Sequence, residues 1–201
     1  SRDWSSDVCS SDLDPVIPFA AKAGFTALAT PKRLVDTRAG QLGEIEKPGG
    51  STGSDITTQL VANIPTRWVV TNQAGIPTTV AALAVNITAI SPPSGGNLRI
   101  YPCTSTATTP PTTSNINYIA GKTLANSAIV APATNGGLCA LSTNNLHIII
   151  DTSGYFPASS TFTALATPKR LVDTRAGQLG EIEKPGGSTG SDITTQLVAN
   201  I

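Results

Sequence analysis

The chain has 201 residues, with 13 basic and 13 acidic side chains, one histidine and a formal net charge of zero. Only 13% of the residues are charged, against the ~25% of an average protein. The balanced charge provides no basic stripe to neutralise phosphates, so we expect no nucleic-acid partner. The longest apolar runs are much shorter than the ~20 residues of a membrane helix, so no membrane span is expected. The many Thr, Ser, Asn, Gly, Pro and Ala residues are typical of an extracellular β-rich domain.

One long stretch of the sequence occurs twice. Residues 25–64 return without substitution as residues 162–201, a period of 137 residues. Solenoid repeats are only ~20–50 residues long, so we expect separate domains in tandem. Residues 1–13 resemble translated sequencing-adapter DNA and are set aside. The remaining chain is predicted to contain a linker, a complete repeat unit, a short linker and the truncated start of a second unit, at residues 14–24, 25–157, 158–161 and 162–201.

Short segments with alternating apolar residues, separated by Gly, Pro, Ser and Thr, predict β-strands. Residues 79–90 are the most apolar and are expected in the middle of a sheet. Residues 41–55 and the Thr/Pro run at 103–113 are expected to form loops. About eight short strands predict a single all-β domain, a β-sandwich or jelly roll, with barrel closure as the alternative. The expected strands are residues 32–37, 56–62, 79–90, 97–102, 115–119, 125–131, 138–142 and 146–151.

Six blocks of the sequence occur in a recognisable order: LVDTRAG, AVNITAISP, NLRIYPC, TSNINYIAGKTLANSAIV, GGLCALS and HIIIDTSGYFP. Together they resemble a tandem module of secreted and cell-surface actinobacterial proteins, which runs from LDTR through NVT, YPCG and SNLNY to DVxGYF. The resemblance covers residues 34–157 and restarts at Leu171. It implies a secreted β-domain appended to wall-associated enzymes or surface proteins. The chain departs from the pattern at Thr104, where glycine usually follows the cysteine, and at Thr152, where valine is usual.

Cys103 and Cys139 lie at the end of one expected strand and inside another. In a chain with this secreted character, we expect them to form a disulfide, and two buried thiols are the alternative. A zinc site would need four ligands, and only His147 is available to join the two cysteines, so we expect no metal and no cofactor.

Two short motifs near the ends of the unit are interpreted as structural. Asp36, Thr37 and Arg38 follow the first expected strand, where Asp36 would accept turn N–H groups and pair with Arg38. The alternative is a ligand clamp. His147 and Asp151 share a face of the last strand but stand about 13 Å apart, too far to share a proton or a metal. The second motif closes the unit with Asp151, Gly154, Tyr155 and Phe156.

Three further aromatic side chains, Trp68, Tyr101 and Tyr118, would form a sugar-stacking platform if they gathered on one edge, and core packing is the alternative. Asn86 begins an Asn-Ile-Thr sequon, which we interpret as a coincidence inside a core strand. Carboxylates are sparse, and no nucleophile motif accompanies His147.

The sequence therefore predicts a secreted, wall-associated, non-catalytic module that spaces, displays or tethers a partner at the bacterial cell envelope. Its expected partners are neighbouring repeats or an appended catalytic domain. A carbohydrate- or cell-wall-binding module is the first alternative, and a fragment of a secreted hydrolase is the weaker one.

Overall fold

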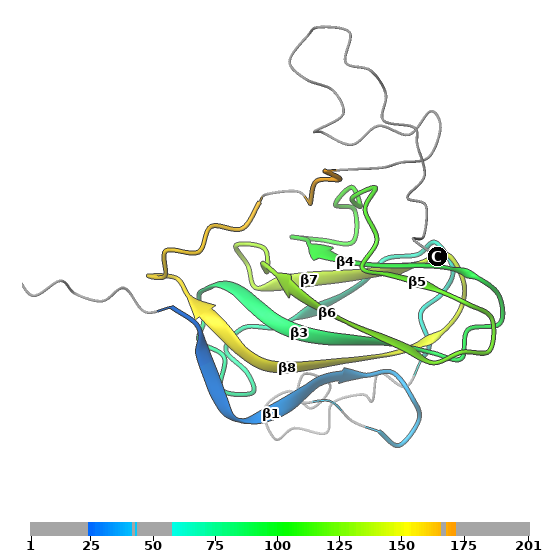
Figure 1. The fold of residues 1–201 in the computed structure, drawn as a ribbon, viewed down its shortest axis with the longest axis horizontal. Helices are drawn as coiled ribbons and strands as arrows, with labels where there is room; N and C mark the ends of the chain where they lie inside the picture. The colour runs from blue at the N-terminus through cyan, green and yellow to red at the C-terminus, as the bar shows by residue number, and fades with distance from the viewer. Residues whose placement is uncertain (1–23, 42, 44–57, 166–167, 172–201) are drawn as a thin grey trace, which may run out of the picture.

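The computed structural model describes residues 24–41, 43, 58–165 and 168–171. Within these residues the chain forms strands and loops without any helix (Figure 1). The strands are β1 (Thr26–Asp36), β2 (Thr66–Val69), β3 (Val80–Ile90), β4 (Gly96–Pro102), β5 (Ile116–Tyr118), β6 (Leu124–Val130), β7 (Gly137–Ser142) and β8 (His147–Pro157).

The eight strands form two four-stranded antiparallel sheets. One sheet has the order β1-β8-β3-β6 and the other β2-β7-β4-β5. Figure 1 shows the two sheets as separate layers, with β1, β8 and β3 on one side and β7, β4 and β5 on the other. The predicted all-β sandwich is therefore confirmed, because the described strands make two open sheets instead of one closed barrel.

The core lies between the two sheets. Along β3, Val85, Ile87 and Ala89 are buried, whereas the intervening Asn86 is exposed. The same alternation brings Leu98 and Ile100 of β4 inward, as their sequence pattern predicts. The largest fully buried side chains include Leu34, Leu60, Leu83, Leu138, Ile148 and Ile150, which come from both sheets and from the loop before β2.

The first and last strands are longer than the sequence predicts. β1 begins six residues before the expected start at Lys32, and β8 continues to Pro157 instead of ending at Asp151. The two extensions stabilise each other, since Thr26 lies opposite Tyr155 and Ala27 opposite Gly154. Pro31 in the first extension, and Gly154 and Pro157 in the second, locally favour loops, but β8 pairs with two strands and stays in the sheet over its full length.

The predicted second strand, residues 56–62, is wrong within its described part. Residues 58–62 contribute only one isolated bridge, between Leu60 and Leu146, and Asn63 follows with a positive φ of 60°. The actual second strand is β2, which the sequence analysis missed because four residues with a central arginine and tryptophan show too short a pattern. Leu60 is apolar because it anchors a loop in the core, not because it belongs to a strand.

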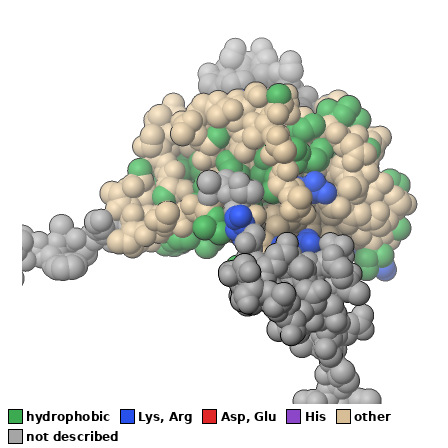
Figure 2. Space-filling model, turned by 90° about the horizontal axis from the view of Figure 1, so that it is seen from above, with side chains coloured by type: hydrophobic (Ala, Val, Ile, Leu, Met, Phe, Trp, Pro, Cys, Tyr) green, Lys and Arg blue, Asp and Glu red, His purple; other side chains and the backbone are tan. Residues whose placement is uncertain are grey.

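Several expected segments fall outside the described residues. These are residues 1–13, nearly all of the linker 14–24, most of the loop 41–55 and most of the second copy, from 172 to 201. The surface shown in Figure 2 is dominated by uncharged side chains with only a few Lys or Arg groups, in keeping with the low charge of the sequence.

Candidate functional site

Four polar side chains form a row across the outer face of the β1-β8-β3-β6 sheet. Asn86 of β3 lies directly opposite Ser127 of β6 on one side and Asp151 of β8 on the other. Asp151 in turn lies opposite Arg33 of β1. The row faces away from the core, because the neighbouring residues on β3 are buried and Asn86 is exposed. Each of the four strands therefore contributes one hydrogen-bonding group to the same line.

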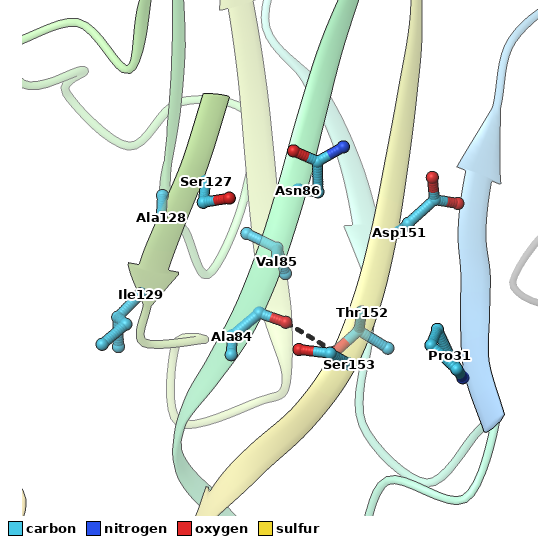
Figure 3. A pocket seen from close by; sticks show the side chains of 10 residues that line it. All are labelled: Pro31, Ala84, Val85, Asn86, Ser127, Ala128, Ile129, Asp151, Thr152 and Ser153. Carbon is cyan, nitrogen blue, oxygen red and sulfur yellow. Dashed lines mark hydrogen bonds between the residues drawn. The ribbon is translucent and has the colours of Figure 1, made fainter. Parts of the chain in front are cut away.

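Three members of the row, Ser127, Asn86 and Asp151, line a shallow groove of about 360 Å³. Figure 3 shows Ser127, Asn86 and Asp151 on their three neighbouring strands, with Ile129 and Pro31 towards the two margins. A second hollow of about 380 Å³ continues past Pro31 and Asp151 to Lys32 and Arg33. The combined groove presents a hydroxyl, an amide, a carboxylate and a guanidinium on a partly apolar floor. This chemistry suits an extended, polar ligand rich in hydroxyl or amide groups.

The carboxylate of Asp36 is fully buried and is held by two arginines. Arg38 donates to it through Nε (2.9 Å), Nη2 (2.7 Å) and its backbone N–H (3.2 Å). Arg33 donates a further hydrogen bond through Nη1 at 3.1 Å. Arg33 also binds Asp151 through Nε at 2.9 Å. The ion pair and the turn N–H bond expected of Asp36 and Arg38 are both present, and Arg33 connects them to the end of the unit.

The environment shifts the pKa of Asp36. Burial raises this pKa, but the hydrogen bonds and charges of Arg38, with the charge of Arg33, together lower it below the ordinary value of 3.8. Asp36 therefore stays ionised at neutral pH, and it accepts at least four hydrogen bonds from within the fold. A carboxylate with all of its partners supplied by the protein has little capacity left to bind a ligand.

The side chains of Thr37 and His147 are also in contact. The Thr37 hydroxyl accepts a hydrogen bond from the Ile148 backbone N–H at 2.9 Å and lies 3.2 Å from His147 Nδ1. His147 is therefore tied to the end of β1, and no contact joins it to Asp151 in the described structure. This arrangement fixes the turn after β1 against the start of β8.

The last three residues of the closing motif hold the start of β1. A Cβ atom at Gly154 would collide with the backbone oxygen of Thr26 and the ring of Phe25, so only glycine allows this approach. The ring of Phe156 packs against that of Phe25 in a tilted arrangement, with centroids 5.5 Å apart. Tyr155 is half-buried and packs against the core.

The three aromatic residues considered for a stacking platform do not form one. Trp68, Tyr101 and Tyr118 are each no more than 3% exposed. Trp68 and Tyr118 belong to the main core, whereas Tyr101 packs with the two cysteines in a separate small cluster. The core-packing alternative therefore describes all three, since a sugar ring needs an exposed aromatic face.

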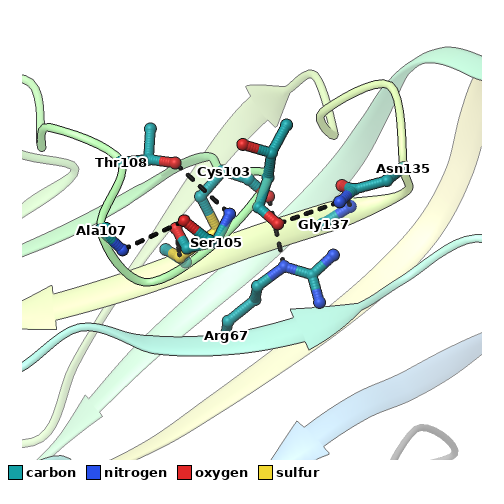
Figure 4. Close-up of a disulfide and its surroundings, with 9 residues drawn as sticks. Arg67, Cys103, Ser105, Ala107, Thr108, Asn135 and Gly137 are labelled. Carbon is teal, nitrogen blue, oxygen red and sulfur yellow. Dashed lines mark hydrogen bonds between the residues drawn. A yellow bond between two sulfur atoms is a disulfide. The ribbon is translucent and has the colours of Figure 1, made fainter.

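Cys103 and Cys139 form the expected disulfide, with Cα atoms 5.7 Å apart. It joins the residue after β4 to the middle of β7, on the outer side of the second sheet (Figure 4). The loop after Cys103 folds back over it, and Arg67 and Asn135 donate hydrogen bonds to the backbone oxygens of Cys103 and Thr104. The disulfide lies on the opposite face from the groove and stabilises the loop instead of forming part of a site.

The groove residues Arg33, Asn86 and Ser127 were missed as a group by the sequence analysis. Asn86 interrupts the apolar alternation of its strand, which indicates an outward position, but the register that aligns it with Ser127 and Asp151 is not visible in sequence. Asn86 lies in an inner strand of its sheet, as expected, but its side chain is exposed on the outer face.

No protein-family model matches the chain, and no curated protein is significantly similar to it. Within the described residues, no helix could cross a membrane. The same residues contain no group of three or more His, Cys, Asp or Glu side chains that could hold a metal ion.

Proposed function

We propose that the chain is a non-catalytic repeat module of a secreted or cell-surface protein that displays a partner domain at the cell envelope. The proposal rests on a domain-sized repeat. The first and last strands of its unit lie side by side, so the start and the end of the unit are close together in space. Phe25, before the first strand, packs in a tilted arrangement against Phe156 near the end of the last strand, with ring centroids 5.5 Å apart. The period of 137 residues allows one such unit to follow another directly.

Three roles are expected for the module: spacing, display and tethering. The start of β1 and the end of β8 lie close together, and this favours display over the other two. The chain enters and leaves the described unit at the same end of the sandwich, so such a unit would add little length between its neighbours. The body of the sandwich then projects sideways from the line of connections. Repetition of such a unit multiplies weak contacts, whereas a catalytic centre gains little from it beyond copy number.

The disulfide supports the extracellular part of the proposal. Disulfides persist in oxidising compartments and are rare in the cytosol. Both sulfurs are buried, at 1% and 0% exposure of their residues, so the bond is protected from reductants once the domain has folded.

Incubation of the intact chain with peptidoglycan, chitin and cellulose tests the absence of catalysis. We expect no soluble sugar or peptide fragments and little retention on the polymers. Release of fragments that is lost in the His147→Ala variant would contradict the proposal, because His147 is the only histidine in the sequence and the only ready general base at neutral pH.

A glycan- or wall-binding module is the second candidate, and the polar row in the groove favours it. If the groove binds a polysaccharide, the Asn86→Ala variant should lose retention on that polymer. Asn117→Ala is the matched control, since Asn117 is an exposed asparagine in β5 of the opposite sheet. Equal retention of wild type and both variants would remove the groove as the binding site.

A further inference from the structure

We propose that residues 162–201 can occupy the same place in the fold as residues 25–64. The chain would then contain two overlapping complete units, residues 25–161 and residues 65–201, which share the body from 65 to 161. Each is 137 residues long, one full period. The second unit is a circular permutant of the first, and this inference does not depend on the proposed function.

The place that the first copy fills is defined by contacts with the shared body. Among the described strands, β1 lies at the edge of its sheet and has β8 as its only neighbour. After β1, the Thr37 N–H donates to the Ile148 carbonyl at 3.1 Å, and Leu60 and Leu146 exchange backbone hydrogen bonds of 2.9 and 3.2 Å. The residues of the body therefore recognise a sequence that the chain carries twice.

Every residue of the first copy that contacts the shared body has an identical counterpart in the second copy. Leu34, which is fully buried, corresponds to Leu171, and Arg33, which pairs with Asp151, corresponds to Arg170. Because the two copies are identical over 40 residues, the second can reproduce each contact of the first.

The path of the chain permits the exchange. β1 is antiparallel to β8, and Thr26 lies opposite Tyr155. In the same register Thr163 would lie opposite Tyr155, which leaves residues 156–162 as a short hairpin connection. Phe162, the counterpart of Phe25, already stacks on Phe156 with ring centroids 4.6 Å apart.

The fold is also suited to a chain start at the point where the permuted unit would begin. The permuted unit starts at Pro65, between Ile64 and the first residue of β2. Ile64 is 56% exposed and lies outside every strand, so a new start here interrupts no sheet. Adjacent ends and an exposed break are the two conditions under which proteins tolerate circular permutation.

Substitutions in the full chain test the proposal. Leu34→Asp places a charge in the core and disables the first copy, while Leu171→Asp disables the second. We expect each single variant to keep a cooperative thermal transition by circular dichroism, and the double variant to lose it. Loss of the transition in Leu34→Asp alone would overturn the proposal. Survival of the transition in the double variant would also overturn it, because the fold would then need neither copy.

A disulfide trap identifies the occupant directly. In a Leu34→Asp and Cys9→Ser background, Asp151→Cys with Arg170→Cys should form a disulfide within the monomer, since Arg33, the first-copy counterpart of Arg170, lies opposite Asp151. Asp151→Cys with Lys169→Cys is the control, because adjacent strand residues point to opposite faces. A 151–170 link found only in dimers, or no such link, would overturn occupancy by the same chain.

Discussion

Arg33 and Asp151 lie opposite each other on β1 and β8 and form a two-point ion pair, with Nε–Oδ1 at 2.9 Å and Nη2–Oδ2 at 3.4 Å. They are 118 residues apart in sequence. Arg33 also reaches the buried Asp36 at 3.1 Å, so one guanidinium joins the start of the unit to its end. This pair connects the two short motifs that the sequence shows at opposite ends of the repeat.

Removal of the buried carboxylate should destabilise the fold. Asp36→Ala is combined with Asp173→Ala so that the second copy cannot replace the first. We expect a loss of about 2–3 kcal/mol in the free energy of unfolding, because hydrogen bonds to a buried charge are lost while both arginines stay partly exposed. Urea denaturation measures this change in the free energy of unfolding. Asp151→Ala is the control, since its side chain is 31% exposed and should cost at most about 1 kcal/mol. Equal losses in both would show that burial of Asp36 is unimportant.

The same carboxylate predicts an acid dependence of stability. The folded pKa of Asp36 is lowered from 3.8, so the ionised form favours the folded state. This contribution is complete above the unfolded pKa and is lost as the pH falls from about 4 through the folded value. The wild-type melting temperature should fall over this range more steeply than that of Asp36→Asn combined with Asp173→Asn. Parallel curves for the two proteins would contradict the lowered pKa.

Two buried tyrosines should respond oppositely to loss of the hydroxyl. Tyr101 Oη is buried without a hydrogen-bond partner among the described residues. Burial raises the pKa of this phenol, although the charge of Arg99 lowers it. Tyr101→Phe should therefore leave stability unchanged or raise it by about 1 kcal/mol. Tyr118 Oη contacts Ser142 at 2.7 Å, Thr143 at 3.1 Å and Asn144 at 3.2 Å. Tyr118→Phe should cost about 1–2 kcal/mol by chemical denaturation. A larger loss for Tyr101→Phe than for Tyr118→Phe would refute this assignment.

The disulfide should account for a large part of the stability of the unit. Its two cysteines are 36 residues apart, and a closed loop of this size stabilises by roughly 3–4 kcal/mol in the chain-entropy model. Cys103→Ala with Cys139→Ala should lower the free energy of unfolding by this amount, whereas Cys9→Ala should have no effect. Labelling of the denatured, oxidised chain should find one free thiol, Cys9. Stoichiometric labelling of Cys103 or Cys139 would exclude the pairing.

Gly154 should not tolerate a side chain. In Gly154→Ala the methyl group would meet the Thr26 carbonyl and the Phe25 ring, so the start of β1 would have to move away from β8. We expect a loss of about 1–3 kcal/mol, typical of overpacking, and faster hydrogen exchange of the amides of Thr26 and Ala27. Ser153→Ala, at the exposed neighbouring position, is the control. Unchanged exchange at both sites would show that the close approach is not needed.

Sequence pattern was sufficient for the centre of the fold. Strands β3, β4, β6 and β7 alternate or concentrate apolar residues over six or more positions, and their predicted bounds agree with the structure within one or two residues. Two cysteines in a chain of secreted composition were likewise the basis for predicting the disulfide that the structure contains. These features depend on local periodicity and on side-chain chemistry, which a sequence displays directly.

The ends of the fold and the groove were decided only by the tertiary structure. β2 is too short to show a period, and the extensions of β1 and β8 contain Pro31, Gly154 and Pro157, which locally favour a loop. Only pairing between distant segments keeps them extended. The row of Ser127, Asn86, Asp151 and Arg33 depends on the register of four strands. Register is set by cross-strand pairing and bulges, and a shift of one residue would turn each side chain to the opposite face.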